Sequence, residues 1–206
     1  MAVLPEFAAF ARAYGEGTPQ VLATTLIADL ETPVSAMMKL ARDAPMSFLL
    51  ESVEGGAIRG RYSFLGLRPD LIWRCQGEAA EINRDALADM NAFQPCPIAA
   101  GAGTIASLRA VLDCPRIPLP DGMPPMAAGL VGYLGYDCIR LTERIPDTNP
   151  PLMDVPDGLF MRPTVIAVFD TIADTVRIVT PVRPQPGIDA RTAYDAAGAR
   201  IARVVD

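Results

Sequence analysis

The chain places complementary polar side chains close together in one short stretch. Glu51 and Ser52 end an apolar run, and Arg59 and Arg61 follow a glycine-rich segment at 55–56. Because paired glycines allow the backbone angles of a tight reversal, the stretch predicts a β-hairpin that brings these groups together. A carboxylate accepts an ammonium group, and a hydroxyl or guanidinium donates to a carboxylate. Such an edge, with apolar walls beside it, would bind a small zwitterion such as an amino acid.

An ordinary structural explanation of the same residues stays open. Glu51 and Arg61 would then form a surface ion pair beside a plain hairpin, and exposed pairs of this kind contribute little to stability. Spacing alone does not separate a binding edge from an ion pair, so the elements around the hairpin have to be considered.

The pattern along the chain predicts an α+β fold with mainly antiparallel sheets and helices on their outer faces. Helices are expected where apolar residues recur at helical spacing or a cap is present, at 3–14, 33–42, 104–112 and 189–205. Strands are expected at 20–28, 46–53, 61–67, 70–76 and 79–83. A further hairpin is expected from 159–170 and 175–181, with its turn at 171–174.

Three other segments have less regular patterns. Residues 94–103 and 114–125 are rich in proline, so we expect surface loops there. Residues 127–136 alternate glycine with bulky side chains, which predicts a buried strand whose backbone approaches another element closely. Its glycines lack the lysine of a phosphate-binding loop, so nucleotide binding is not expected.

Composition excludes several classes of function. The 206 residues are 50% hydrophobic and 20% charged with a net charge of -6, and no basic stripe is present. We therefore expect no nucleic-acid or membrane partner. No signal-peptide pattern begins the chain, so the cytoplasm is the expected location and the four widely spaced cysteines are expected to be free thiols.

Nothing in the chain predicts catalysis or metal binding. It has no histidine, which excludes Ser-His-Asp triads and histidine-containing zinc fingers. Acidic pairs at 51/54, 78/81 and 170/174 are interpreted as solvated carboxylates, and Asp137, Arg140 and Glu143 as an ion-pair cluster on a short helix. No catalytic residue and no metal ligand is therefore assigned.

Four segments together resemble one enzyme family. One motif is Leu49-Leu-Glu-Ser52 followed by Gly60-Arg-Tyr-Ser-Phe-Leu-Gly66. With three further segments, at 29–35, 129–137 and 140–146, it occurs in the order found in the amino-terminal part of anthranilate synthase component I. The resemblance covers roughly residues 20–170. It implies that residues 1–206 are the regulatory and scaffold region of a two-sheet chorismate-utilising enzyme fold, and that the catalytic carboxy-terminal region is absent.

In that family the Leu-Leu-Glu-Ser segment helps to bind tryptophan, the feedback inhibitor. The effector contacts that the resemblance implies are Leu50, Glu51, Ser52, Arg59, Arg61, Tyr62 and Ser63. The parent lyase converts chorismate and ammonia to anthranilate and pyruvate. Mg²⁺ is expected in the absent catalytic region, and a glutamine amidotransferase subunit is the expected partner.

The chain alone is expected to be inactive, to hold no cofactor, and to self-associate through apolar surface left open. Two alternatives stay open. The parent could be component I of aminodeoxychorismate synthase, or the chain could be a stand-alone amino-acid-binding regulatory module.

Overall fold

The computed structural model describes residues 2–54, 58–113, 116–146 and 153–206. These residues form two compact units. Unit 1 comprises residues 1–68, 115–129 and 163–206, and unit 2 comprises 69–114 and 130–162. Two long strands, β3 (Ile58–Gln76) and β7 (Gly158–Asp170), contribute one part to each unit.

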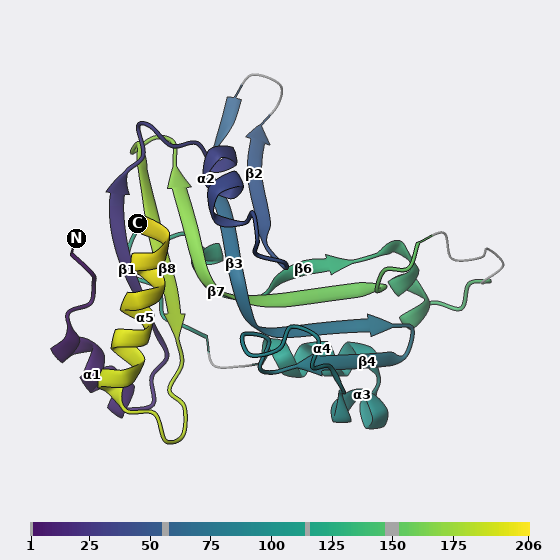
Figure 1. Ribbon diagram of the computed structural model, residues 1–206. Coiled ribbons are helices and arrows are strands. Elements are labelled where there is room, and N and C mark those ends of the chain that lie inside the picture. Colours follow the sequence, from purple (N-terminus) through teal and green to yellow (C-terminus); the bar gives the residue numbers. More distant parts are fainter. Residues whose placement is uncertain (1, 55–57, 114–115, 147–152) are drawn as a thin grey trace. The chain divides into compact units, whose positions relative to one another are not determined.

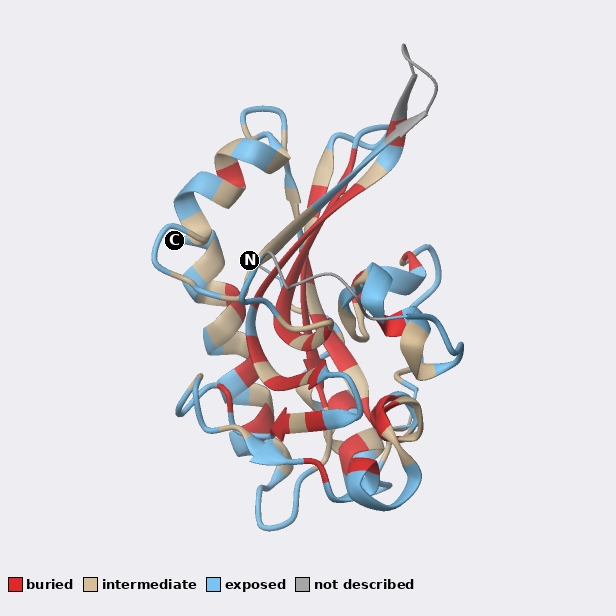
Figure 2. Ribbon diagram, turned by 90° about the vertical axis from the view of Figure 1, so that its right-hand side faces the viewer, coloured by how far each residue is buried: buried red, intermediate tan, exposed pale blue. Residues whose placement is uncertain are grey.

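Unit 1 is built on an antiparallel sheet with the strand order β1-β8-β7-β3 and β2 paired with β3 (Figure 1). The other strands are β1 (Gln20–Ile27), β2 (Phe48–Glu54) and β8 (Thr175–Val182). The pairing of β7 with β8 confirms the predicted hairpin. Buried residues run along these strands (Figure 2).

Three helices contribute to the main hydrophobic core of unit 1. They are α1 (Phe7–Gly15), α2 (Pro33–Leu40) and α5 (Ala190–Val205). Their apolar faces pack with fully buried strand residues such as Leu22 and Leu65. The predicted caps are present, because Thr32 accepts a hydrogen bond from the Ser35 amide and Asp189 accepts one from the Thr192 amide.

A second core in unit 1 includes Phe64, Ile166 and Val179. Part of the proline-rich segment packs against it through partly buried apolar side chains, those of Ile117, Leu119 and Met123. The short 3₁₀ helix η1 (Pro125–Ala127) follows. A segment without regular ladder hydrogen bonds thus still contributes apolar cover to the sheet.

Unit 2 contains the far parts of β3 and β7 together with β4 (Ala79–Asn83), β5 (Gln94–Pro95) and β6 (Val131–Leu134). Its helices are α3 (Pro97–Ala102), α4 (Thr104–Leu112) and η2 (Tyr136–Leu141). Its core centres on Trp73, whose indole nitrogen donates a hydrogen bond of 2.9 Å to the Ser107 hydroxyl.

Two predicted boundaries are wrong at prolines. The strands expected at 61–67 and 70–76 are one continuous strand, in which Arg68 takes a φ of 51° just before Pro69. The loop expected at 94–103 contains α3, because Pro97 occupies a first-turn position where no amide donor is needed. Proline therefore marks a bend in one case and a helix start in the other.

Two further predictions are wrong in part. The first helix begins at Phe7 and not at residue 3, because Leu4 pairs with Ala23 in an isolated β-bridge. The buried strand predicted at 127–136 is present as β6 but is not buried, since Tyr133 is 42% exposed. Its predicted close approach is confirmed, since a Cβ at Gly132 would lie 1.9 Å from the Leu159 carbonyl oxygen.

Candidate functional site

The predicted hairpin of unit 1 exists and contains a marked irregularity. Glu51 lies opposite Ser63, but the next pair places Val53 opposite Arg59. Residues 60–62 of β3 therefore face Ser52 alone on β2. Extra residues of this kind bend a strand locally and redirect its side chains, so the Leu-Leu-Glu-Ser run ends at a distorted point of the ladder.

Ser52 lies directly against the backbone of β3 at this point. A Cβ built on Gly60 would be 2.2 Å from the Ser52 Cβ and 2.3 Å from its Oγ, far inside contact distance. Ser52 is nevertheless exposed to solvent, and Gly60 is buried. Because residue 60 has no side chain, the exposed Ser52 hydroxyl can lie directly against the backbone of β3.

The predicted contact residues divide between the two faces of the hairpin. Side chains alternate between faces along a strand. Leu50 is paired with Phe64 and Glu51 with Ser63, so these two pairs lie on opposite faces. Leu50 is 39% exposed and Glu51 is exposed, whereas Ser63 is buried. The predicted contact residues therefore do not share one face. A single ligand could touch both Leu50 and Glu51 only by reaching across an edge of β2.

Tyr62 and Arg59 complete the predicted set. Tyr62 is partly buried and packs against the core that contains Phe64. The backbone of Arg59 pairs with Val53, and its side chain lies outside the described residues. Its predicted contact with an effector stays a prediction.

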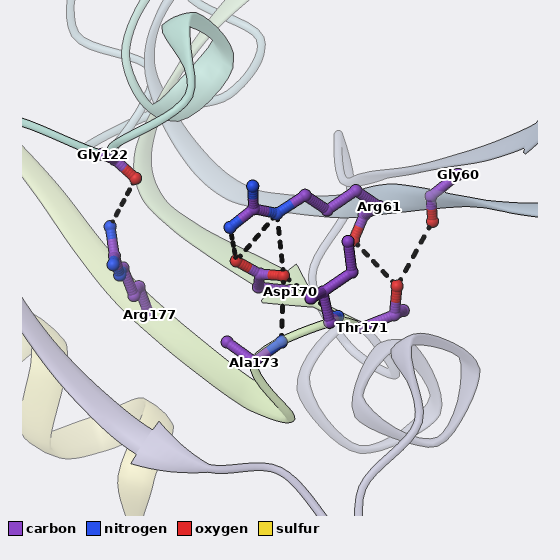
Figure 3. A network of polar contacts seen from close by, with 8 residues as sticks. Gly60, Arg61, Gly122, Asp170, Thr171, Ala173 and Arg177 are labelled. Carbon is purple, nitrogen blue, oxygen red and sulfur yellow. Dashed lines mark hydrogen bonds and ion pairs between the residues drawn. The ribbon is translucent and has the colours of Figure 1, made fainter.

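Arg61 is bound by a residue that sequence reasoning did not connect with it. Its Nη2 lies 2.8 Å and its Nε 3.1 Å from the two carboxylate oxygens of Asp170, at the end of β7 (Figure 3). The guanidinium also lies 4.8 Å from the centre of the Tyr62 ring. The suggested ion pair between Arg61 and Glu51 is therefore wrong, because Asp170 occupies the guanidinium.

Asp170 also organises the turn between β7 and β8. Its Oδ1 accepts hydrogen bonds from the amides of Ile172, at 3.1 Å, and Ala173, at 3.2 Å. The amide of Thr171 donates to the Arg61 carbonyl oxygen at 3.0 Å. The interpretation of Asp170 as a solvated carboxylate is wrong, since it is only 8% exposed.

The electrostatics of this pair follow from the contacts. The hydrogen bonds from Arg61 lower the pKa of Asp170, burial opposes this effect, and the backbone amides of the turn add to it. The Asp170 hydrogen bond in turn raises the pKa of Arg61. Both groups are therefore ionised at neutral pH, and together they join β3 to the β7–β8 turn.

Arg177 on β8 makes a second connection in the same region. Its Nη1 donates a hydrogen bond of 2.8 Å to the Gly122 carbonyl oxygen (Figure 3). This contact ties the proline-rich segment to the sheet. No local pattern indicates either of these arginine contacts, because each partner is far away in the sequence.

Cofactor chemistry has little basis in the described part of the chain. There, no group of three or more histidine, cysteine, aspartate or glutamate side chains is placed to hold a metal ion. These described residues therefore do not fit a Mg²⁺ site, and the site expected in the catalytic region stays a prediction. In the same residues, no helix has the length and apolar character needed to cross a membrane.

Comparisons with known proteins identify relatives. No protein-family model matches the chain. Anthranilate synthase component 1 of Cereibacter sphaeroides is 46% identical over 198 residues, which are 96% of this chain and 39% of the relative. The Thermus thermophilus protein of the same name is 38% identical over 81% of this chain and 33% of the relative. That of Synechocystis is 34% identical over 98% and 39%. The chain thus spans about two fifths or less of their length.

A solved structure supports the fold. The crystal structure of anthranilate synthase component I from Streptococcus pneumoniae has a TM-score of 0.55 to this chain at 18% identity. The match covers 88% of this chain and 36% of the solved chain. It confirms the predicted α+β class, with antiparallel strands and helices.

Proposed function

Because this chain is homologous to anthranilate synthase component 1 along nearly its whole length, we propose that it forms the amino-terminal, regulatory and scaffold part of such a synthase subunit. The parent subunit would convert chorismate and ammonia to anthranilate and pyruvate, as a lyase in tryptophan biosynthesis. Ammonia would come from a glutamine amidotransferase subunit, and the Mg²⁺-binding groups would lie outside this chain.

The regulatory role would rest on the irregular part of the β2–β3 hairpin. Leu50, Glu51 and Ser52 follow one another there with exposed side chains, and the partly buried Tyr62 lies on the neighbouring strand. This run of exposed apolar, acidic and hydroxyl groups is the observation that carries the proposal. Glu51 would accept hydrogen bonds from the ammonium group of tryptophan, and Ser52 would form a hydrogen bond with one of its polar groups. Leu50 and Tyr62 would contact the indole.

The geometry restricts how such a ligand lies. Leu50 and Glu51 face opposite sides of the strand, so a single ligand reaches both only across an edge of β2. Among the described residues β2 pairs with β3 alone, which leaves the second edge of β2 available. We therefore place tryptophan at this edge, where the rest of a full-length subunit would supply the other wall.

Arg61 would act in this site by positioning. Its Nε and Nη2 are engaged with Asp170, and its guanidinium lies over Tyr62. These contacts hold β3, and with it Tyr62 and Ser63, relative to the β7–β8 turn. Direct contact of Arg61 with the effector stays a prediction of the family resemblance.

The effector site is tested by substituting Ser52 in the full-length enzyme. Leaving a polar group of the bound ligand unpaired costs about 1 to 3 kcal/mol, which corresponds to roughly 5- to 150-fold in affinity. Ser52→Ala should therefore raise the tryptophan concentration for half-inhibition by that factor, and weaken inhibition more than turnover. Ser47→Ala, just before β2, is the matched control and should leave the inhibition curve in place. Unchanged inhibition in Ser52→Ala would remove Ser52 from the site.

The division of labour is tested with the isolated chain. It should form no anthranilate from chorismate, ammonia and Mg²⁺, and calorimetry should show weak tryptophan binding or none. Anthranilate fluorescence above a no-protein control would contradict the proposal. With the full-length enzyme, identifying the product as anthranilate or aminodeoxychorismate separates the two synthase families.

Exposed apolar side chains in unit 1 are consistent with a missing partner surface. Ile27 is 78%, Leu30 90% and Ile172 73% exposed. The Ala28 amide donates to the Asp174 carbonyl oxygen, which brings the end of β1 next to the β7–β8 turn. We expect the isolated chain to form dimers or larger species in size-exclusion chromatography with light scattering. A strictly monomeric profile would contradict the proposal that this apolar surface is normally covered by the rest of a full-length subunit.

A further inference from the structure

Unit 2 buries two thiols beside one another. Cys75 lies on β3 and is 2% exposed, and Cys138 lies on η2 and is 9% exposed. Both sulfurs lie against the two-residue segment 157–158, and neither is in a disulfide. Two residues from distant parts of the chain therefore meet at one point of the core.

The backbone at Asp157 and Gly158 fixes this arrangement. The Cys138 thiol donates to the Asp157 carbonyl oxygen at 3.1 Å, and the Asp157 amide donates to the Cys75 carbonyl oxygen at 2.9 Å. A Cβ on Gly158 would lie 3.1 Å from the Cys75 sulfur, so the absence of a side chain there makes room for the thiol. The same two-residue segment thus contacts both cysteines.

We propose that Cys75 and Cys138 form an oxidisable pair, which a peroxide converts into a disulfide bond inside unit 2. The proposal rests on the contact of both thiols with residues 157–158 and is independent of the function proposed above. It assigns a covalent modification site, with hydrogen peroxide as the oxidant.

The reaction balances in two steps. The thiolate of one cysteine attacks one peroxide oxygen, the O–O bond breaks, and the departing hydroxide takes up a proton to leave as water. The sulfur of the other cysteine then attacks the resulting sulfenic acid, an S–S bond forms, and a second water leaves. Two thiols and one hydrogen peroxide thus give one disulfide and two waters.

The environment of the two thiols determines how fast they are oxidised. Burial raises the pKa of both thiols, that of Cys75 to about 12. The hydrogen bond from Cys75 partly offsets this effect by lowering the pKa of Cys138. Little thiolate is present on either cysteine, so oxidation should be slower than that of an exposed thiol.

A cleft gives the oxidant a route to Cys75, the member of the pair that lines it. It has a volume of about 680 Å³, and its lining includes Cys75, Gln76, Asp154 and Val155. A peroxide molecule is close to water in size, so the cleft admits it readily. Cys96 lines the same cleft and is equally buried, which makes it an internal control.

The sequence makes the test direct, because each cysteine lies in its own tryptic peptide. These peptides are 75–84, 85–109, 110–116 and 117–140. The whole chain is treated with hydrogen peroxide, its remaining thiols are blocked with N-ethylmaleimide, and the unreduced digest is analysed by mass spectrometry. We expect peptides 75–84 and 117–140 to become cross-linked while 85–109 keeps the maleimide label. A cross-link of 85–109 to either of them, full labelling of 75–84 and 117–140, or higher oxides of Cys75 or Cys138 without a cross-link would overturn the proposal.

Variants sharpen the result. Cys75→Ala and Cys138→Ala should each abolish the cross-link, whereas Cys96→Ala should form it at the wild-type rate. Circular dichroism establishes that each variant is folded, and the mapping of the unmodified chain decides the question even if a core substitution is not tolerated. A cross-link to Cys138 that persists in Cys75→Ala would also contradict the assignment.

Discussion

The polar side chains on the two strands of the β2–β3 hairpin differ in their exposure and in their hydrogen-bond partners. On β2, Glu51 and Ser52 are exposed, and in the described part of the chain their side chains have no hydrogen-bond partner. On β3, Arg61 is bound by the nearly buried carboxylate of Asp170. The charge on β3 thus has a partner within unit 1, whereas the polar side chains on β2 face solvent.

This difference gives each strand a separate role in the proposed site. The Arg61–Asp170 contact anchors β3 to a turn that the carboxylate also organises. A ligand at β2 would then meet a fixed neighbour and need not order it, which lowers the entropic cost of binding. Four predictions test this separation, from the largest expected effect to the smallest.

The largest effect is expected at the point where the two strands touch. In Gly60→Ala the new methyl group would lie 2.2 Å from the Ser52 Cβ, so one strand has to shift. Overpacking of this kind costs about 3 kcal/mol at the upper end of its usual range. Denaturant unfolding measures the loss. The control Gly198→Ala meets nothing within 4 Å in helix α5 and should stabilise by about 0.5 to 1 kcal/mol. Equal stability of Gly60→Ala and the parent chain would contradict the tight contact.

A smaller loss is expected when the anchor of β3 is weakened. Asp170→Asn removes the negative charge that accepts hydrogen bonds from Arg61 and from two turn amides. We expect Asp170→Asn to lower the free energy of unfolding by about 2 kcal/mol, because hydrogen bonds to a charged group are lost. The loss is no larger because half of the Arg61 side chain is exposed and its charge is screened by solvent. Hydrogen exchange should speed up at the Ile172 and Ala173 amides. The exposed Asp174 provides the control, and Asp174→Asn should leave those amides protected.

The same carboxylate should make stability depend on pH. Its pKa is lower in the folded chain than in the unfolded chain, so its contribution is complete above the unfolded value of about 4. As pH falls from there through the folded pKa, the native carboxylate takes up a proton and the contribution is lost. The difference in stability between the parent chain and Asp170→Asn should therefore shrink on acidification below about pH 4. A constant difference down to low pH would show that charge is not what the pair contributes.

The smallest effect is expected on β2. Ser52→Ala and Glu51→Gln alter exposed groups, so each should change the free energy of unfolding by less than about 0.5 kcal/mol. A loss above 1 kcal/mol in either would show that these groups serve the fold, and would weaken their assignment to a ligand. Unfolding curves of the isolated chain are sufficient for this measurement.

Local signals in the sequence predicted most elements because their causes are local. Thr32 and Asp189 cap the helices that follow them, and both bonds span only three residues. The β7–β8 hairpin follows from two apolar runs around a short turn. The errors occurred at prolines and near the amino terminus. There, the residue types alone do not distinguish a bend at Arg68 from a strand end, or a first helical turn at Pro97 from a loop.

The sequence by itself determined the fold class and the hairpin, because strand alternation and turn residues act over a few positions. Tertiary structure alone decided which groups meet. Arg61 finds Asp170 across 109 positions of sequence, and Cys75 meets Cys138 across two separate elements. The spacing of charged residues or cysteines in the sequence does not reveal which of them will be partners in the fold. A long-range contact exists only where strand order and register bring two backbones together, and those depend on the packing of the whole unit.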